Sequence, residues 1–187
     1  MKEGVILYIA ASQDGYIADA KGECDFLPWI PEDDYDFGYR QMYDSVDAII
    51  MGRTTYEWII SPSPAGQWPY GDKRCWVYSR TPREGTDTIE FVNEEPEKLL
   101  HRVRSNGARR VWLMGGGEII RMFLQKDLID VFDIFYAPVL IGDGTPMFPA
   151  GFPLTDLILE KTETRGGLVE IVYRKKTNSF MRKGSHY

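Results

Sequence analysis

The stretch Val111–Ile120, VWLMGGGEII, joins an apolar run to three consecutive glycines and then to a second apolar series. The first run has the length of a buried strand, and the second has the spacing of an amphipathic helix. Glycines at the carboxyl end of a strand allow a tight turn and a close approach of another group to the backbone. Because the following helix adds the positive end of its dipole, the stretch predicts a phosphate-binding turn. A simple turn between strand and helix is the alternative, since the run lacks the GxGxxG pattern of dinucleotide folds.

Apolar runs and amphipathic segments alternate on both sides of this stretch. Helical spacing occurs in segments 94–107 and 117–127, whereas 157–177 contains two strands around a Gly-Gly turn. The alternation predicts an α/β fold with a mostly parallel central sheet and an antiparallel C-terminal edge hairpin. The runs that are typical of strands buried on both faces are Val5–Ala11, Asp47–Gly52, Cys75–Ser79, Arg109–Met114 and Val131–Leu140.

Length and composition limit the classes of protein that the chain can represent. With 187 residues, 43% of them hydrophobic, we expect one domain over residues 1–177 and a tail over 178–187. The net charge of −6, with interleaved signs, argues against a nucleic-acid partner. The N-terminal apolar run is too short for a signal peptide or a membrane span, which predicts a cytoplasmic protein without a membrane partner. Only two histidines and two distant cysteines, Cys24 and Cys75, are present, so we expect no metal site and no disulfide framework.

Five motifs follow one another in an order that resembles the dihydrofolate reductase-like superfamily, and most closely the reductase domain of riboflavin biosynthesis. The resemblance covers almost the whole chain. It begins with Ser12, Asp14 and Gly15, which are similar to the Ser-x-Asp-Gly of the riboflavin reductases. The other motifs are LPWIPEDDYDF (27–37), MGRTTYE (51–57), VYSRTP (77–82) and the long segment from the three glycines to FP (115–149).

This resemblance implies a three-layer α/β/α fold, an NADPH cofactor and a small nitrogen heterocycle as substrate. Arg53 and Arg80, with Ser79 beside the second, are expected to meet the adenosine 2′-phosphate, which NADH lacks. A homodimer is typical of the riboflavin branch. The residues expected to bind substrate are Trp29, Phe37 and Ala137. Those expected to bind cofactor are Ala11, Ile17, Gly52, Arg53, Thr54, Thr55, Ser79, Arg80, Gly115, Gly116, Gly117, Glu118, Ile119 and Thr145.

An acidic residue is also expected, because hydride delivery to a C=N group leaves a substrate that needs a proton or passes through a cation. In dihydrofolate reductase this residue follows the proline-tryptophan pair. Counting from Pro31 indicates Asp33, whereas counting from Trp29 indicates Asp34. The alternative is that these carboxylates only begin a helix, where the dipole favours them.

Two departures from the riboflavin enzymes concern the substrate. The His-x-Glu and Pro-Cys-x-x-Cys signature of the fused zinc deaminase is absent from the sequence. The segment 31–45 is acidic where the family has phosphate-binding arginines, and Arg40 is its only basic residue. We therefore expect an NADPH-dependent reductase of the riboflavin-reductase type, with a phosphorylated substrate in doubt. A dihydrofolate reductase is the alternative enzyme, and a non-catalytic NADP-binding protein is the alternative of another class.

Overall fold

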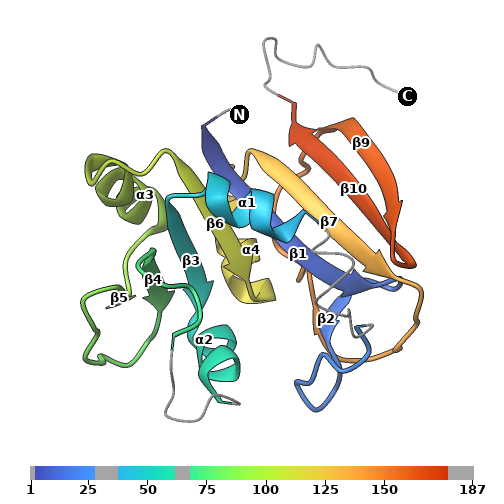
Figure 1. The fold of residues 1–187 in the computed structure, drawn as a ribbon, viewed down its shortest axis with the longest axis horizontal. Coiled ribbons are helices and arrows are strands. Elements are labelled where there is room, and N and C mark those ends of the chain that lie inside the picture. Colours follow the sequence, from blue (N-terminus) through green and yellow to red (C-terminus); the bar gives the residue numbers. More distant parts are fainter. Residues whose placement is uncertain (1–2, 28–37, 62–67, 177–187) are drawn as a thin grey trace.

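The predicted mixed sheet is present in the computed structural model, which describes residues 3–27, 38–61 and 68–176 (Figure 1). An eight-stranded sheet has the order β5-β4-β3-β6-β1-β7-β10-β9. The first six strands of this order are parallel, and β10 and β9 are antiparallel at one edge. The strands are β1 (Gly4–Ser12), β3 (Ala48–Gly52), β4 (Arg74–Tyr78), β5 (Ile89–Val92), β6 (Arg110–Gly115), β7 (Val131–Ala137), β9 (Leu157–Arg165) and β10 (Leu168–Lys175).

Helices cover both faces of this sheet, as a three-layer α/β/α fold requires (Figure 1). On one face, α3 (Pro96–Ser105) and α4 (Gly117–Gln125) contribute Leu99, Val103, Ile120 and Phe123 to the largest core cluster. On the other face, α1 (Tyr39–Ser45) and α2 (Arg53–Ile60) pack on a second cluster that includes Trp112. None of the helices in the described ranges is long and apolar enough to cross a membrane.

The structure corrects the expected elements in two places. The strand expected over Val131–Leu140 ends at Ala137, because Pro138 has no N–H to continue the ladder. Three short strands were not expected: β5, and the pair β2 (Tyr16–Ala18) and β8 (Thr145–Pro146). Each has two to four residues, which is too few for periodicity to reveal.

Hydrogen bonds of the Ser-x-Asp-Gly motif connect the turn after β1 to the loop between β7 and β8. The Ser12 hydroxyl, fully buried, donates to Asp14 Oδ1 at 2.6 Å and accepts from the Tyr16 amide at 3.0 Å. Asp14 Oδ2 in turn accepts from the amides of Ile141 at 3.2 Å and Gly142 at 2.7 Å. The Ser12 hydroxyl, followed by these backbone amides, holds the pKa of the Asp14 carboxyl below its usual range. The motif therefore anchors the loop between β7 and β8 against the turn after β1.

A charged cluster lies on β7, β10 and β9, on the same side of the sheet as α1. Glu170 is only 5% exposed, and its Oε2 lies 2.8 Å from Lys161 Nζ and 3.1 Å from Arg165 Nε. Burial, followed by the negative charge of Glu170, raises the pKa of Asp133 on β7 to about 7. Asp133 therefore carries a proton in the folded state at pH values where it would be ionised in the unfolded chain.

This shift predicts a pH dependence of stability. Between about pH 4 and pH 7 the folded state binds the extra proton, so the free energy of unfolding should fall as the pH rises, and the contribution of Asp133 should level off above about pH 7. Asp133→Asn is neutral at every pH and removes this dependence. The difference between the wild type and the variant should change by up to about 1.4 kcal/mol per pH unit across this range. Urea unfolding at several pH values measures it, with the exposed Asp87→Asn as control. Parallel curves for the wild type and Asp133→Asn would contradict the prediction.

Candidate active site

A cavity of about 850 Å³ lies at the carboxyl ends of β3, β4 and β6. Parallel strands bring these ends to one edge of the sheet, and the segments that follow the strands form the wall. Gly52 leads into α2, Ser79 and Arg80 follow β4, and Gly116 leads into α4. Segments far apart in the sequence are thus brought to one site.

The three glycines have different roles. Gly115 adopts a φ of +115°, which a residue with a side chain rarely takes up. A Cβ at Gly117 would lie 2.3 Å from the Pro146 carbonyl oxygen, so this glycine lets α4 pack closely against β8. A Cβ at Gly116 would lie 3.6 Å from both Ile17 Cδ1 and Thr55 Oγ1, which is ordinary contact distance. All three of these last residues line the cavity, so a side chain at Gly116 would lie in the cavity wall between Ile17 and Thr55.

The beginning of α4 faces this space without a capping side chain. Gly116 occupies the N-cap position, and no side chain in the described ranges caps the helix there. Its carbonyl oxygen accepts from the amides of Ile119 at 3.0 Å and Ile120 at 3.1 Å, which starts the helical hydrogen bonding. The first amides of a helix have no partner within the helix and attract anions. Gly116 and the start of α4 together can therefore receive a phosphate group.

Two arginines lie on the same cavity. Arg53 is the first residue of α2, and its Nη1 lies 3.5 Å from Glu57 Oε1. Arg80 is exposed and forms no ion pair within the described ranges. The Ser79 hydroxyl donates to the Thr81 carbonyl oxygen at 2.7 Å and so stabilises the turn that carries Arg80. In this arrangement the hydroxyl proton is not free to bind a phosphate. Among the lining residues that the structure describes, these two guanidinium groups are the cations that a second phosphate could meet.

Most of the predicted cofactor residues line the cavity, and three predicted residues do not. Ala11, Gly115 and Ala137 are buried and are absent from the described cavity lining. Ala11 and Ala137 belong to the core clusters, and their assignments to the site stay predictions. The predicted residues that line the cavity are Ile17, Gly52, Arg53, Thr54, Thr55, Ser79, Arg80, Gly116, Gly117, Glu118, Ile119 and Thr145.

Four predicted residues lie outside the described residues: Asp33 and Asp34, the expected acids, and Trp29 and Phe37, the expected substrate contacts. Their assignments stay predictions. The tail over 178–187 is also outside the described part of the chain.

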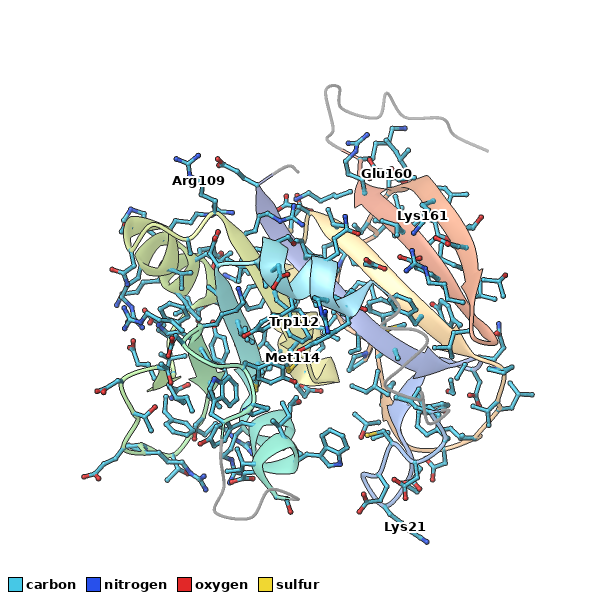
Figure 2. All side chains as sticks on the ribbon, in the orientation of Figure 1. Lys21, Arg109, Trp112, Met114, Glu160 and Lys161 are labelled. Atoms are coloured by element: carbon cyan, nitrogen blue, oxygen red, sulfur yellow. The ribbon has the colours of Figure 1, made fainter. Side chains whose placement is uncertain are left out.

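The structure adds a set of lining residues that sequence reasoning missed. We call Tyr8, Tyr70 and Trp112, whose rings meet at Trp112, the aromatic end of the cavity; Leu27, Trp58 and Met114 are further lining residues. The Trp112 ring centroid lies 6.0 Å from that of Tyr8 and 5.5 Å from that of Tyr70, and Figure 2 labels Trp112 and Met114 on β6 near α1. The Trp112 Nε1–H donates to the Tyr8 carbonyl oxygen at 3.0 Å. Trp112 and Met114 are two positions apart on β6, so their side chains lie on the same face of the strand. This spacing does not show whether that face packs in the core or lines a cavity.

The sheet order, the glycine turn before α4 and the cavity at the strand ends define a protein with the dihydrofolate reductase-like fold. Comparison with known families is more specific. The profile of the RibD C-terminal domain family matches residues 3–170, and the chain belongs to this family.

Several relatives match over nearly their whole length. The uncharacterized protein YwjB of Bacillus subtilis is 36% identical over 174 residues, which cover 92% of this chain and 98% of the relative. A structure from Shewanella sp. PV-4, described as a candidate riboflavin biosynthesis protein, is 30% identical with a TM-score of 0.85, covering 93% of this chain and 99% of that one. The matched regions span almost the whole of both relatives.

A longer, bifunctional relative has the same fold in part of its chain. The structure of the diaminohydroxyphosphoribosylaminopyrimidine deaminase/5-amino-6-(5-phosphoribosylamino)uracil reductase of Thermotoga maritima is 19% identical, with a TM-score of 0.70. The match covers 94% of this chain but only 57% of that one. At this identity the likeness shows the fold alone.

Proposed function

We propose that the protein is an NADPH-dependent reductase that delivers a hydride to a small nitrogen heterocycle. The observation that carries the proposal is the glycine turn at the start of α4, whose Gly116 lines one cavity together with Arg53 and Arg80. One anion-binding turn and two further cations suit a dinucleotide that carries a pyrophosphate and a 2′-phosphate. Membership of the RibD C-terminal domain family, and 30% identity to a structure described as a candidate riboflavin biosynthesis protein, support the same reaction class.

The residues of the cavity fit this cofactor. Gly116, Gly117 and the first turn of α4 would hold the pyrophosphate, and Thr55, whose Oγ1 lies near the same space, can donate a hydrogen bond to it. Arg53 and Arg80 would meet the 2′-phosphate. When bound, NADPH supplies a hydride, and the protein supplies binding and orientation.

The chain's own residues then have two tasks at the aromatic end. Tyr8, Tyr70 and Trp112 form an apolar wall that excludes water from a bound ring, and exclusion of water strengthens the electrostatic interactions inside a site. A carboxylate, Asp33 or Asp34 in our proposal, holds the proton that completes the reduction.

The cofactor assignment predicts a preference between two dinucleotides. NADPH should bind at least about tenfold more tightly than NADH, because a charge-assisted phosphate contact contributes on the order of 1.5–3 kcal/mol. Isothermal titration calorimetry measures both affinities. Arg80→Gln should reduce the preference, because it removes an exposed cation that lines the cavity.

Arg109→Gln is the matched control for this prediction. Arg109 is exposed and pairs with Glu3. It lies at the amino end of β6, whereas the cavity lies at the carboxyl ends of the strands (Figure 2). Equal affinities for NADPH and NADH, or an equal effect of both substitutions, would contradict the role given to Arg80.

The alternatives differ in what the bound cofactor does. Oxidation of NADPH by dihydrofolate, but not by aminouracils, would favour a dihydrofolate reductase. Tight binding without oxidation across both substrate classes would favour a non-catalytic NADP-binding protein.

A homodimer is also part of our proposal. The edge strand β9 carries Leu157, Ile158 and Leu159, all of them exposed, and exposed apolar edge strands are natural pairing surfaces. The dimer stays a prediction.

A further inference from the structure

Two guanidinium groups and one carboxylate meet at the cavity, between α2 and the loop that follows β4. Glu57 Oε1 lies 2.8 Å from Arg83 Nη2 and 3.5 Å from Arg53 Nη1. The first distance is typical of a close ion pair, whereas the second is near the outer limit for a hydrogen bond. We call these three residues the Glu57 cluster. Its single shared oxygen is held mainly by Arg83 and only weakly by Arg53.

Arg83 is held in place from two sides. It lies in the loop between β4 and β5, and its Cζ lies 5.9 Å from the Phe91 ring centroid on β5, which is within the range of a cation–π contact. The Phe91 ring also contacts Tyr56 on α2, with ring centroids 5.4 Å apart. Arg83 therefore contacts both β5 and α2. It is not among the lining residues of the cavity in the described ranges.

Arg53, in contrast, lines the cavity and is weakly supported by its own helix. It is the first residue of α2, where the positive end of the helix dipole disfavours a cation. An i,i+4 ion pair is also weaker when the cation is the residue nearer to the helix N-terminus, as it is for Arg53 and Glu57. Gly52, at the N-cap of α2, lines the same cavity and provides no capping side chain. A phosphate in the cavity would offer Arg53 a stronger partner than Glu57.

The charges of the Glu57 cluster indicate what Arg83 contributes. Two guanidinium groups and one carboxylate leave one positive charge for a ligand. Without Arg83, the ion pairs of Glu57 within the described ranges would be reduced to the one with Arg53, and a neutral pair would face the cavity. An anion would then have to displace Glu57 before it could bind Arg53. Arg83 can thus affect the binding of an anion that it does not contact.

We propose that Arg83 is a positioning residue: by holding the Glu57 carboxylate, it leaves the Arg53 guanidinium group available to a phosphate of the ligand. The proposal rests on the proposed function in one respect, which is the assignment of Arg53 to a phosphate of the cofactor. It adds a residue outside the cavity that controls the charge inside it. Glu57 has the role of a competitor for Arg53.

The test compares two nucleotides that differ by one phosphate: adenosine 2′,5′-bisphosphate and adenosine 5′-phosphate. Calorimetry at low ionic strength measures both affinities, and their ratio reports the contribution of the 2′-phosphate. The wild type should bind the bisphosphate more tightly. The three side chains are 39–41% exposed, so Arg83→Gln should lower the ratio by about two- to fivefold, as expected for partly exposed ion pairs. A general loss of structure would instead weaken the binding of both nucleotides.

A second substitution distinguishes a positioning role from direct contact. In the double variant Arg83→Gln/Glu57→Gln the competitor is neutral as well, so the ratio should return at least to the wild-type value. If Arg83 contacts the phosphate itself, the double variant should bind as weakly as the single variant. An unchanged ratio in Arg83→Gln, or no recovery in the double variant, would overturn the proposal.

Arg174→Gln is the matched control. Arg174 Nε lies 2.8 Å from Glu160 Oε1 on the β9–β10 hairpin, and neither residue lines the cavity (Figure 2). This substitution removes an ion pair of the same length and should leave the ratio unchanged. An equal effect of Arg174→Gln and Arg83→Gln would also overturn the proposal.

The outcome is separable from that of the proposed function, because the titrations require neither the nicotinamide nor turnover. A lower ratio in Arg83→Gln with recovery in the double variant, in a protein that oxidises no NADPH, contradicts the reductase assignment alone. A wild type that prefers the bisphosphate, with the same ratio in Arg83→Gln, contradicts only the role of Arg83. Equal affinities of the wild type for both nucleotides would overturn the proposal and the cofactor assignment together.

Discussion

Gly116→Ala is expected to weaken NADPH binding by at least about tenfold while leaving the fold intact. The new Cβ would lie at ordinary contact distance, 3.6 Å, from Ile17 Cδ1 and Thr55 Oγ1, so the free protein accommodates it. The same atom would occupy cavity space next to the first amides of α4, where a phosphate must come close. Losing charge-assisted hydrogen bonds to such amides costs on the order of 1.5–3 kcal/mol. Calorimetry measures the affinity, and thermal unfolding measures the fold.

Gly117→Ala is the informative comparison. Its Cβ would lie 2.3 Å from the Pro146 carbonyl oxygen, so this substitution should destabilise the packing of α4 against β8 before any ligand is present. A lower unfolding temperature is expected for Gly117→Ala and not for Gly116→Ala. If a folded Gly116→Ala protein binds NADPH normally, the glycines serve only as a turn.

Asp33→Asn is expected to lower turnover by roughly 10²–10⁴-fold, the usual contribution of a positioned general acid or base. Asparagine keeps the size and a capping oxygen of aspartate but cannot carry the charge or the proton. The free energy of unfolding should change by well under about 1 kcal/mol, because Asn caps a helix nearly as well as Asp. Steady-state oxidation of NADPH, on whichever heterocycle the wild type reduces, measures the effect, and NADPH affinity should be unchanged.

Asp34→Asn resolves the ambiguity in spacing. If Asp34 is the working carboxylate, its substitution gives the large loss of turnover and Asp33→Asn gives little. Near-full activity of both variants would mean that the acidic run only favours a helix start, and that the proton comes from water or from another group.

The architecture could be predicted from the sequence because the spacing of apolar residues reflects which side chains are buried. Continuous apolar runs such as Val5–Ala11 became central parallel strands, and the final segment with its Gly-Gly turn became the β9–β10 hairpin. The glycine run was also informative, because a turn with room for a ligand requires residues without side chains. Its location between β6 and α4 was confirmed.

The individual roles of these glycines required the tertiary structure. Gly115, Gly116 and Gly117 are the same residue type, and only the tertiary structure distinguishes them. Gly115 has a positive φ, Gly116 lies in the cavity wall, and Gly117 allows a close contact with Pro146. The Ser79 hydroxyl is a similar case, because its bond to the Thr81 carbonyl oxygen depends on the path of the loop.

What the sequence by itself determined is therefore the order of the layers and the end of the parallel strands at which the cavity lies. These follow from local patterns: strand-length apolar runs, helical spacing, and glycines at a strand end. Only the tertiary structure decided the chemistry of the aromatic end, because Tyr8, Tyr70 and Trp112 come from distant segments and read as core residues in the sequence. Whether an aromatic side chain fills a core or lines a cavity depends on what the fold places opposite it, and that is a property of packing between elements.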